Sequence, residues 1–263
     1  MVALARLPRP EGDHRAPAPT GTSDRTDEFP PATASKEWGR SRPPPRRPNR
    51  PPRPWREWCA MKLVVQEFLT FDGVSQGPGA PDEDTSGGFT RGGWFVPYLD
   101  EEFERLAGTW LGEADAFLFG RRTYRNFARD WPKMTDHPSA RILNGLPKYV
   151  ASDTLTEADW NPTTILSGDI AARVTELKRR PGRELQVHGS ARLAQSLLAA
   201  GLIDTLRLVV APVVVGQGRR LFPDGGAPAG LRLVSHRTTP GGLSVHILEP
   251  TGRPEYGTYG ADA

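Results

Sequence analysis

Three arginines, a threonine and a tyrosine follow a glycine directly after a short apolar segment. The segment runs from Ala114 to Phe119, and the residues that follow read GRRTYR. A glycine at a strand end lets the backbone approach a ligand, and the next helix directs free N–H groups and its positive dipole end at the same place. A helix that merely begins with basic residues is the alternative. The residues that suit a phosphate monoester, such as the one on the adenosine ribose of NADPH, are Gly120, Arg121, Arg122 and Thr123.

A second strand-to-helix junction, ELQVHGSARLAQSLL, repeats this arrangement. Gly189 is predicted to make the turn and Ser190 to cap the helix, so that the N–H groups of Ala191 and Arg192 face a pyrophosphate. The junction lacks the GxGxxG spacing of standard dinucleotide-binding folds. The preceding histidine, His188, is either a proton carrier or a residue packed at the strand end.

The first predicted strand, 61–69, ends at a turn signal, Phe71-Asp72-Gly73. The glycine-rich stretch that follows predicts a long mobile loop, and its aromatic residues Phe89, Trp94 and Phe95 favour a functional one. Asp100 is the expected N-cap of the next helix.

Strands and helices then alternate, which is typical of an α/β domain with a mostly parallel sheet covered on both faces. Strands are predicted at 114–119, 148–151, 163–166 and 184–187, and helices at 121–127, 139–143, 170–179 and 191–200. Only strands follow, at 205–215, 231–239 and 243–248, and Pro-Gly-Gly joins the last two into an antiparallel hairpin. The expected fold is a three-layer αβα sandwich.

The N-terminal segment, residues 1–60, differs in composition from the rest. It holds 13 prolines, and its 11 arginines and one lysine outnumber its seven acidic residues by five, whereas the whole chain carries +3. The basic charge therefore belongs to this segment, and no nucleic-acid binding is expected for the folded part. Proline removes backbone donors, so we expect no packed structure there. It is either an upstream extension of a protein that starts at Met61 or a flexible basic arm.

Cysteine and apolar content limit the classes of protein further. The chain has one cysteine, Cys59, which excludes disulfides and cysteine metal sites within the folded part, and no metal is expected. The sequence shows neither a signal peptide nor an apolar run of membrane-spanning length, so a cytoplasmic enzyme-sized domain over 61–250 is expected. Residues 251–263 are expected to form a loose tail.

Several motifs in order carry a resemblance to a known family: FLTFDGV, FLFGRRTYRNF, LPKYVAS, VHGSARLAQSLL and IDTLRLVVAPVVVGQGRRLF. Together they resemble the dihydrofolate reductase superfamily, most closely the reductase half of the bifunctional deaminase-reductase of riboflavin biosynthesis. The resemblance implies a dihydrofolate reductase-like fold, an NADPH cofactor, and hydride transfer to a C=N bond of a small heterocycle or its ribosyl derivative. It also implies a homodimer formed through the C-terminal strands.

The resemblance also assigns roles to residues. It places the ribose phosphate at 120–123, the adenosine at Ser152 and the pyrophosphate at 189–192. It places the nicotinamide and substrate at Gln66, Phe68, Asp72 and Trp94.

Two departures from the family pattern bear on the substrate. The carboxylate that folate reductases carry on their first helix has three candidates here, Asp100, Glu101 and Glu104, of which Asp100 is the candidate catalytic residue. Acids that favour a helix N-terminus are the alternative explanation. The glycine-rich insertion at 76–93 makes folate a doubtful substrate. A pteridine-type reductase and a nucleotide-binding protein without catalysis stay open as alternatives.

Overall fold

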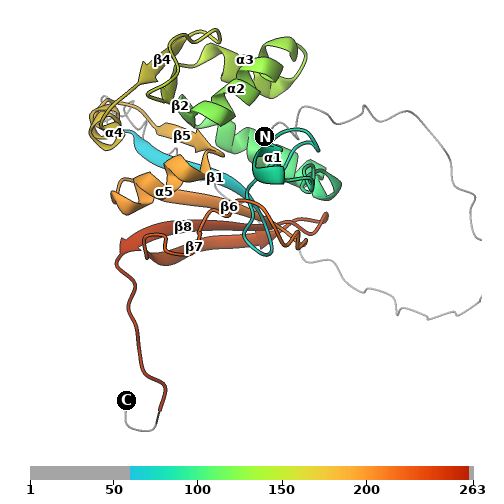
Figure 1. The fold of residues 1–263 in the computed structure, drawn as a ribbon, viewed down its shortest axis with the longest axis vertical. Helices are drawn as coiled ribbons and strands as arrows, with labels where there is room; N and C mark the ends of the chain where they lie inside the picture. The colour runs from blue at the N-terminus through green and yellow to red at the C-terminus, as the bar shows by residue number, and fades with distance from the viewer. Residues whose placement is uncertain (1–59, 261–263) are drawn as a thin grey trace, which may run out of the picture. The chain divides into compact units, whose positions relative to one another are not determined.

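The computed structural model describes residues 60–260; Cys59 and nearly all of the expected N-terminal extension lie outside the described residues. One eight-stranded sheet has the order β4-β3-β2-β5-β1-β6-β8-β7, and Figure 1 shows it with β4 at the top and β7 at the bottom. The strands from β4 to β6 in this order are parallel to one another. Strand β8 runs antiparallel to both of its neighbours, β6 and β7. The strands are β1 Lys62–Thr70, β2 Ala114–Gly120, β3 Lys148–Ala151, β4 Thr163–Leu166, β5 Glu184–His188, β6 Thr205–Ala211, β7 Gly230–Thr238 and β8 Ser244–Gly252.

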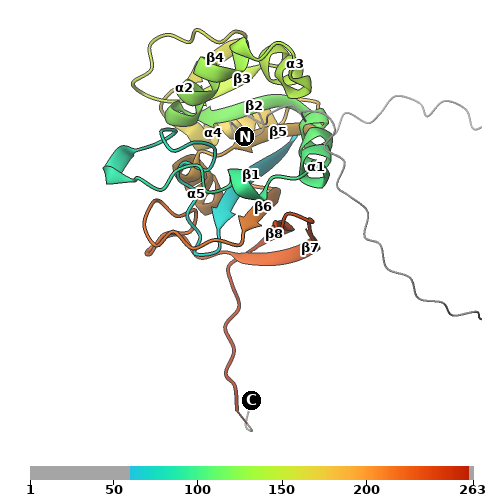
Figure 2. The same ribbon diagram turned by 90° about the vertical axis from the view of Figure 1, so that its right-hand side faces the viewer.

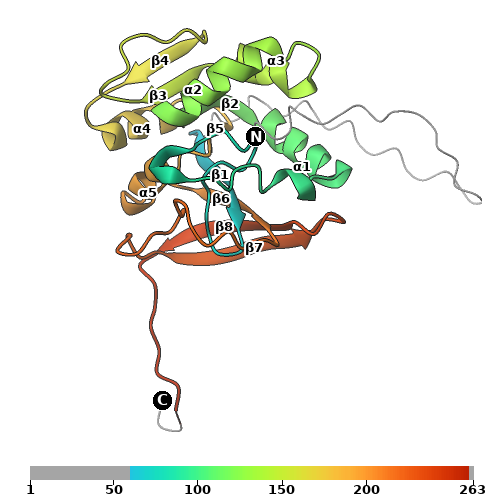
Figure 3. The same ribbon diagram turned by 45° about the vertical axis from the view of Figure 1, so that its right-hand side comes forward.

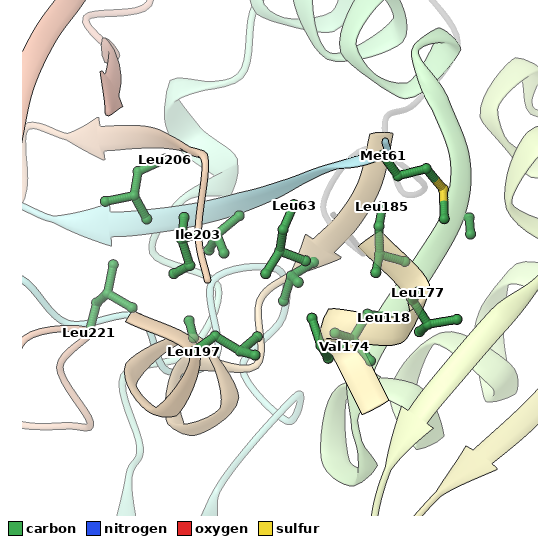
Figure 4. Close-up of a cluster of buried hydrophobic side chains, with 14 of the residues drawn as sticks. Met61, Leu63, Leu118, Val174, Leu177, Leu185, Leu197, Ile203, Leu206 and Leu221 are labelled. Atoms are coloured by element: carbon green, nitrogen blue, oxygen red, sulfur yellow. The ribbon is translucent and has the colours of Figure 1, made fainter. Parts of the chain in front are cut away.

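Helices cover both faces of the sheet, which confirms the three-layer αβα class. On one face, α4 and α5 pack on apolar side chains of β1, β5 and β6, the cluster drawn in Figure 4. On the other face, α1, α2 and α3 cover two further apolar clusters. The helices are α1 Glu101–Gly112, α2 Arg121–Asp130, α3 Pro138–Gly145, α4 Ile170–Lys178 and α5 Ala191–Ala199.

The predicted strand 205–215 is too long. In the structure β6 ends at Ala211, directly before Pro212. Proline has no N–H to donate to a ladder, and the chain after it turns toward the end of β1. There the carbonyl of Val213 accepts from the N–H of Phe71 at 2.8 Å, and the N–H of Val215 donates to the Asp72 carboxylate at 3.2 Å.

The loop between β1 and α1 packs on the domain through its aromatic side chains and one glutamine. Figure 2 shows this loop, in teal, beside α2. Phe89, Trp94 and Phe95 are buried, and Phe95 stacks on Phe68 with ring centroids 4.1 Å apart. The buried Gln76 donates to the backbone carbonyls of Asp84 and Ser86 and accepts from the N–H of Arg219. Contacts near both ends of the loop, at Gln76 and at Phe95, therefore hold it against the domain, although the sequence predicted a mobile loop.

A row of polar side chains lies on the sheet under α1. Arg207 forms a two-point ion pair with Glu184, with N–O distances of 2.9 and 2.7 Å. Its guanidinium also lies over the Trp110 ring, 5.2 Å from the centroid. Gln186 donates to Glu184 and to the Trp110 carbonyl, so its amide oxygen is left to accept. The row continues along β5 toward the carboxyl ends of the strands.

The two C-terminal strands form one margin of the sheet, as Figure 3 shows in red. Every residue of β7 after Gly230 is exposed, including Leu231, Leu233 and Val234. None of the helices formed by residues 60–260 combines the length and the apolar character needed to cross a bilayer.

The exposed β7 strand makes the expected homodimer testable. Natural proteins normally cover an edge strand that exposes apolar side chains. We therefore expect light scattering to report twice the chain mass at micromolar concentration, and Leu231→Lys with Leu233→Lys to shift it to the monomer. Phe222→Lys, which removes another exposed apolar side chain, is the control. A single-chain mass for the unaltered protein would contradict the prediction.

Candidate active site

A cavity of ≈ 430 Å³ opens at the carboxyl ends of the central strands. Strands β1 and β5 pair only as far as Gln66 and His188, and from Glu67 onward β1 pairs with β6 alone. The cavity lies where the two strands part, and this is where open α/β sheets bind ligands. Its wall is built from the end of β1, the loop 75–84, the starts of α2 and α5, and Arg219.

The two helices that begin at the cavity lack a side-chain cap. In the described part of the chain, α1, α3 and α4 are each capped by the side chain that precedes them, whereas α2 and α5 are not. Their first N–H groups therefore stay available to an anion, and the helix dipoles favour one there.

The predicted cap at Ser190 is wrong. Ser190 adopts a left-handed conformation, φ 68° and ψ 40°, directly after Gly189 with φ 55°. Its hydroxyl points to the neighbouring strand ends, where it accepts from the N–H of Gly120 at 2.9 Å and donates to the His188 carbonyl at 3.2 Å. Ser190 thus joins the two helix starts and leaves the α5 N-terminus open.

Four arginines line the cavity, and three of them form hydrogen bonds to side chains of the neighbouring segments. Arg121 donates to the Thr154 hydroxyl, and Arg122 donates to the Ser86 hydroxyl at 3.1 Å. Arg219 binds Ser86 and forms an ion pair with Asp84. The donor set, guanidinium groups beside two open helix starts, fits the phosphates of a dinucleotide cofactor. The fourth arginine that lines the cavity is Arg192.

Most of the residues proposed from the sequence meet in this cavity. They are Gln66, Phe68, Gly120, Arg121, Arg122, Thr123, Gly189, Ser190, Ala191 and Arg192. Asp72, Trp94, Asp100 and Ser152 are not among the lining residues.

These four residues hold other parts of the chain in place. Asp100 caps α1 at the N–H of Phe103 and also accepts from Gly241, at 2.8 and 2.6 Å. Asp72 accepts from the N–H groups of the 215–216 turn, and the indole of Trp94 donates to the carbonyl of Gln76. The Ser152 hydroxyl accepts from the two N–H groups at 154–155. Residues 60–260 also contain no group of three potential metal ligands.

Glu67, the acid between Gln66 and Phe68 on β1, was not predicted from the sequence. Glu67 lines the cavity, yet only 3% of its surface is accessible. Its Oε1 atom has no hydrogen-bond partner in the described part of the chain. Burial raises the pKa of its carboxyl to about 8, because an unpaired charge is unfavourable away from water. The signal in the sequence was a lone acid within the apolar stretch KLVVQEFL.

His188 belongs to the polar row under α1 and does not line the cavity. Its Nε2 atom lies 3.0 Å from the Gln186 amide oxygen, which also accepts from Gln66. Since that oxygen accepts, Nε2 carries the hydrogen, and the buried Nδ1 has no partner among residues 60–260. Burial lowers the pKa of His188 to about 3, so the ring is neutral at physiological pH. This placement favours the packed-histidine alternative.

Comparisons with known proteins agree with this arrangement of strands and site. Residues 61–245 match the family model described as the RibD C-terminal domain, and the chain belongs to that family. The uncharacterized protein YyaP of Bacillus subtilis strain 168 is 31% identical over 137 residues, 51% of this chain and 72% of the relative.

Two solved structures share the fold. One is a Shewanella sp. PV-4 protein provisionally named a riboflavin biosynthesis protein, with a TM-score of 0.53 and 18% identity over 73% of this chain and 99% of that chain. The other is the Thermotoga maritima diaminohydroxyphosphoribosylaminopyrimidine deaminase/5-amino-6-(5-phosphoribosylamino)uracil reductase, with a TM-score of 0.51, 12% identity, and coverage of 73% of this chain and 57% of that chain. The dihydrofolate reductase-like fold expected from the motifs is thereby confirmed.

Proposed function

We propose that the protein is an NADPH-dependent reductase that transfers hydride to a C=N bond of a small heterocycle or its ribosylated derivative. The observation that carries the proposal is the pair of open helix starts, each beside arginines, on one cavity at the carboxyl ends of the strands. Membership of the RibD C-terminal domain family supports the reaction class, since a protein of this fold is named as a 5-amino-6-(5-phosphoribosylamino)uracil reductase.

The two helix starts divide the cofactor between them in this proposal. Arg121 and Arg122, with Gly120 and Thr123, hold the ribose phosphate at the start of α2. The open N–H groups of α5 and the Arg192 side chain hold the pyrophosphate. Gly189 suits this role, because its left-handed φ and missing side chain let the turn lie close to a ligand.

The gap between β1 and β5 then receives the reacting ends of cofactor and substrate, next to Gln66, Glu67 and Phe68. When bound, the nicotinamide supplies the hydride, and the protein's part is to orient the two partners and exclude water. We leave Asp72, Trp94, Asp100 and Ser152 out of the proposed ligand contacts, because their polar groups serve backbone groups elsewhere.

Cofactor binding followed by fluorescence tests this proposal. We expect NADPH to bind tightly, and the Arg121→Ala, Arg122→Ala double variant to lose about tenfold or more of its affinity, since the lost contacts are charge-assisted. NADH lacks the ribose phosphate, so its weaker binding should not change. With 5-amino-6-(5-phosphoribosylamino)uracil as the probe, the unaltered chain should then oxidise NADPH.

The matched control is Arg125→Ala with Arg141→Ala, which removes two positive charges from residues that do not line the cavity. An equal loss of NADPH affinity in this control would assign the effect to net charge and contradict a ribose-phosphate site. Tight binding without oxidation of NADPH by any heterocycle would favour the nucleotide-binding protein without catalysis.

A further inference from the structure

Glu67 is a buried acid in the wall of the proposed reductase site that no part of the proposed function yet uses. We propose that Glu67 is the catalytic proton donor of this site, and the inference rests on the reductase function proposed above. It stands on three observations: the residue lines the cavity, its carboxyl has an unpartnered buried oxygen, and it lies where β1 separates from β5.

On its own face of β1, Glu67 lies between apolar side chains. Side chains alternate between the faces of a strand, so Glu67 shares its face with Val65 and Leu69, both in the cluster under α5. An unpartnered carboxyl in such a place contributes nothing to stability that an apolar side chain would not provide better. A chemical role explains its presence.

The cationic side chains that share the cavity leave Glu67 unpaired. No ion pair or hydrogen bond joins any of them to Glu67 within residues 60–260, and three of the arginines bind other side chains, at Thr154, Ser86 and Asp84. On the neighbouring strand, His188 lies on the other face and is neutral. The charged side chains of the cavity are Glu83, Asp84, Arg121, Arg122, Arg192 and Arg219. The carboxyl therefore keeps its proton at neutral pH, as burial dictates.

A neutral carboxyl at this position completes the reduction of a C=N bond. As the carbon accepts the hydride, the π-electron pair of the C=N bond moves onto nitrogen. The O–H bond of Glu67 breaks, its proton joins that nitrogen, and the carboxylate keeps the bonding pair. Glu67 regains a proton from solvent through the open cavity after the product leaves. Atoms and charges balance, since the substrate gains one hydride and one proton.

The timing of charge formation favours this assignment. Glu67 would become an anion at the step in which a bound nicotinamide would supply a positive charge to the same cavity. The carboxylate and that positive charge would attract each other, and the burial of Glu67 strengthens the Coulomb interaction. A group that is hard to ionise in the free protein thus becomes easier to ionise at the step that needs it.

This coupling can be measured without turnover. The full chain is labelled with carbon-13 at the glutamate carboxyl carbons, and the Glu67 resonance is assigned by its loss in Glu67→Gln. Its titration is followed in the free protein, with saturating NADPH and with saturating NADP⁺. We expect the proton affinity of Glu67 to be about tenfold or more lower with NADP⁺ than with NADPH. The resonance of Glu176 on α4, assigned through Glu176→Gln, serves as the internal control.

The outcomes separate the two proposals. Equal titration with both cofactors, despite saturation by each, overturns the role of Glu67 and leaves the reductase function standing. Failure of either cofactor to bind overturns both.

A kinetic readout distinguishes proton donation from a purely structural role. With 5-amino-6-(5-phosphoribosylamino)uracil as the probe, kcat of the unaltered chain should fall as pH rises through the Glu67 pKa. Glu67→Gln should be about a hundredfold slower at neutral pH, with little change in KM and without that alkaline decline. Glu176→Gln, on the exposed surface of α4, is the control. An unchanged rate in Glu67→Gln would overturn the proposal.

Discussion

The free energy of unfolding is expected to be greatest between about pH 4.5 and pH 6.5 and to fall on both sides. Glu67 causes the alkaline decline. Its pKa rises from an ordinary 4.5 to about 8 on folding. Between these values the folded chain keeps a proton that the unfolded chain has released, so stability is lost as pH rises through this interval. At about 1.4 kcal/mol per pKa unit, the loss is roughly 3 to 5 kcal/mol.

The acid decline has the opposite origin. The pKa of His188 falls from 6.5 to about 3 on folding. The unfolded chain therefore takes up a proton that the folded chain refuses, and stability is lost as pH falls through this interval. Between the ordinary pKa values of the two groups, 4.5 and 6.5, Glu67 lowers the free energy of unfolding as pH rises and His188 raises it, so the two effects cancel.

Urea unfolding at about pH 5.5 and about pH 9 tests the alkaline decline. Glu67→Gln should exceed the unaltered chain by only about 1.4 kcal/mol at the lower pH and by roughly 3 to 5 kcal/mol at the higher pH. Glu176→Gln should follow the unaltered chain at both. Parallel curves for Glu67→Gln and the unaltered chain would show that Glu67 is not buried as described.

Removing either partner of the ion pair under α1 is expected to destabilise the fold strongly. The side chains of Arg207 and Glu184 are only 11% and 12% accessible. Arg207→Met leaves a buried carboxylate, and Glu184→Leu leaves a buried guanidinium over the Trp110 ring. Each single change should cost about 3 to 5 kcal/mol in the free energy of unfolding, because an unpaired buried charge remains.

The double variant separates the loss of the pair from the cost of an orphaned charge. Arg207→Met with Glu184→Leu leaves no buried charge, so it should recover most of the loss. The exposed pair of Arg232 and Glu249, whose side chains are 62% and 39% accessible, gives the control. Glu249→Leu should change stability by less than about 1 kcal/mol. Additive losses in the double variant would contradict a direct coupling between Arg207 and Glu184.

The sequence predicted the strands and helices well where periodicity and turn residues agree. The bounds of β3 and β4 match their predictions, and Asp100 caps α1 as expected. The prediction for β6 was wrong, because the apolar run continues past Pro212 although the strand does not. Apolar composition alone does not show where a strand leaves its sheet.

The candidate site was only partly predictable for a similar reason. The glycines at 120 and 189 mark the strand-to-helix turns from sequence alone. The left-handed Ser190 and its contact with Gly120 depend on β2 and β5 lying side by side, which only the folded sheet determines. Glu67 was not predicted because its role is inferred from a buried carboxyl without a hydrogen-bond partner. Burial and partners depend on how the chain packs around β1.

The separation of β1 from β5 also has a consequence for how the site tolerates mutation. Gln66 turns its carbonyl toward β5, where it accepts from the N–H of Gly189. Residues two apart on a strand turn their backbone groups to the same edge, so those of Phe68 face the opening, beyond the last pair of β1 and β5. This N–H and carbonyl can serve a ligand whichever amino acid other than proline occupies position 68. These backbone groups are set by the fold, and substitutions other than proline leave them in place.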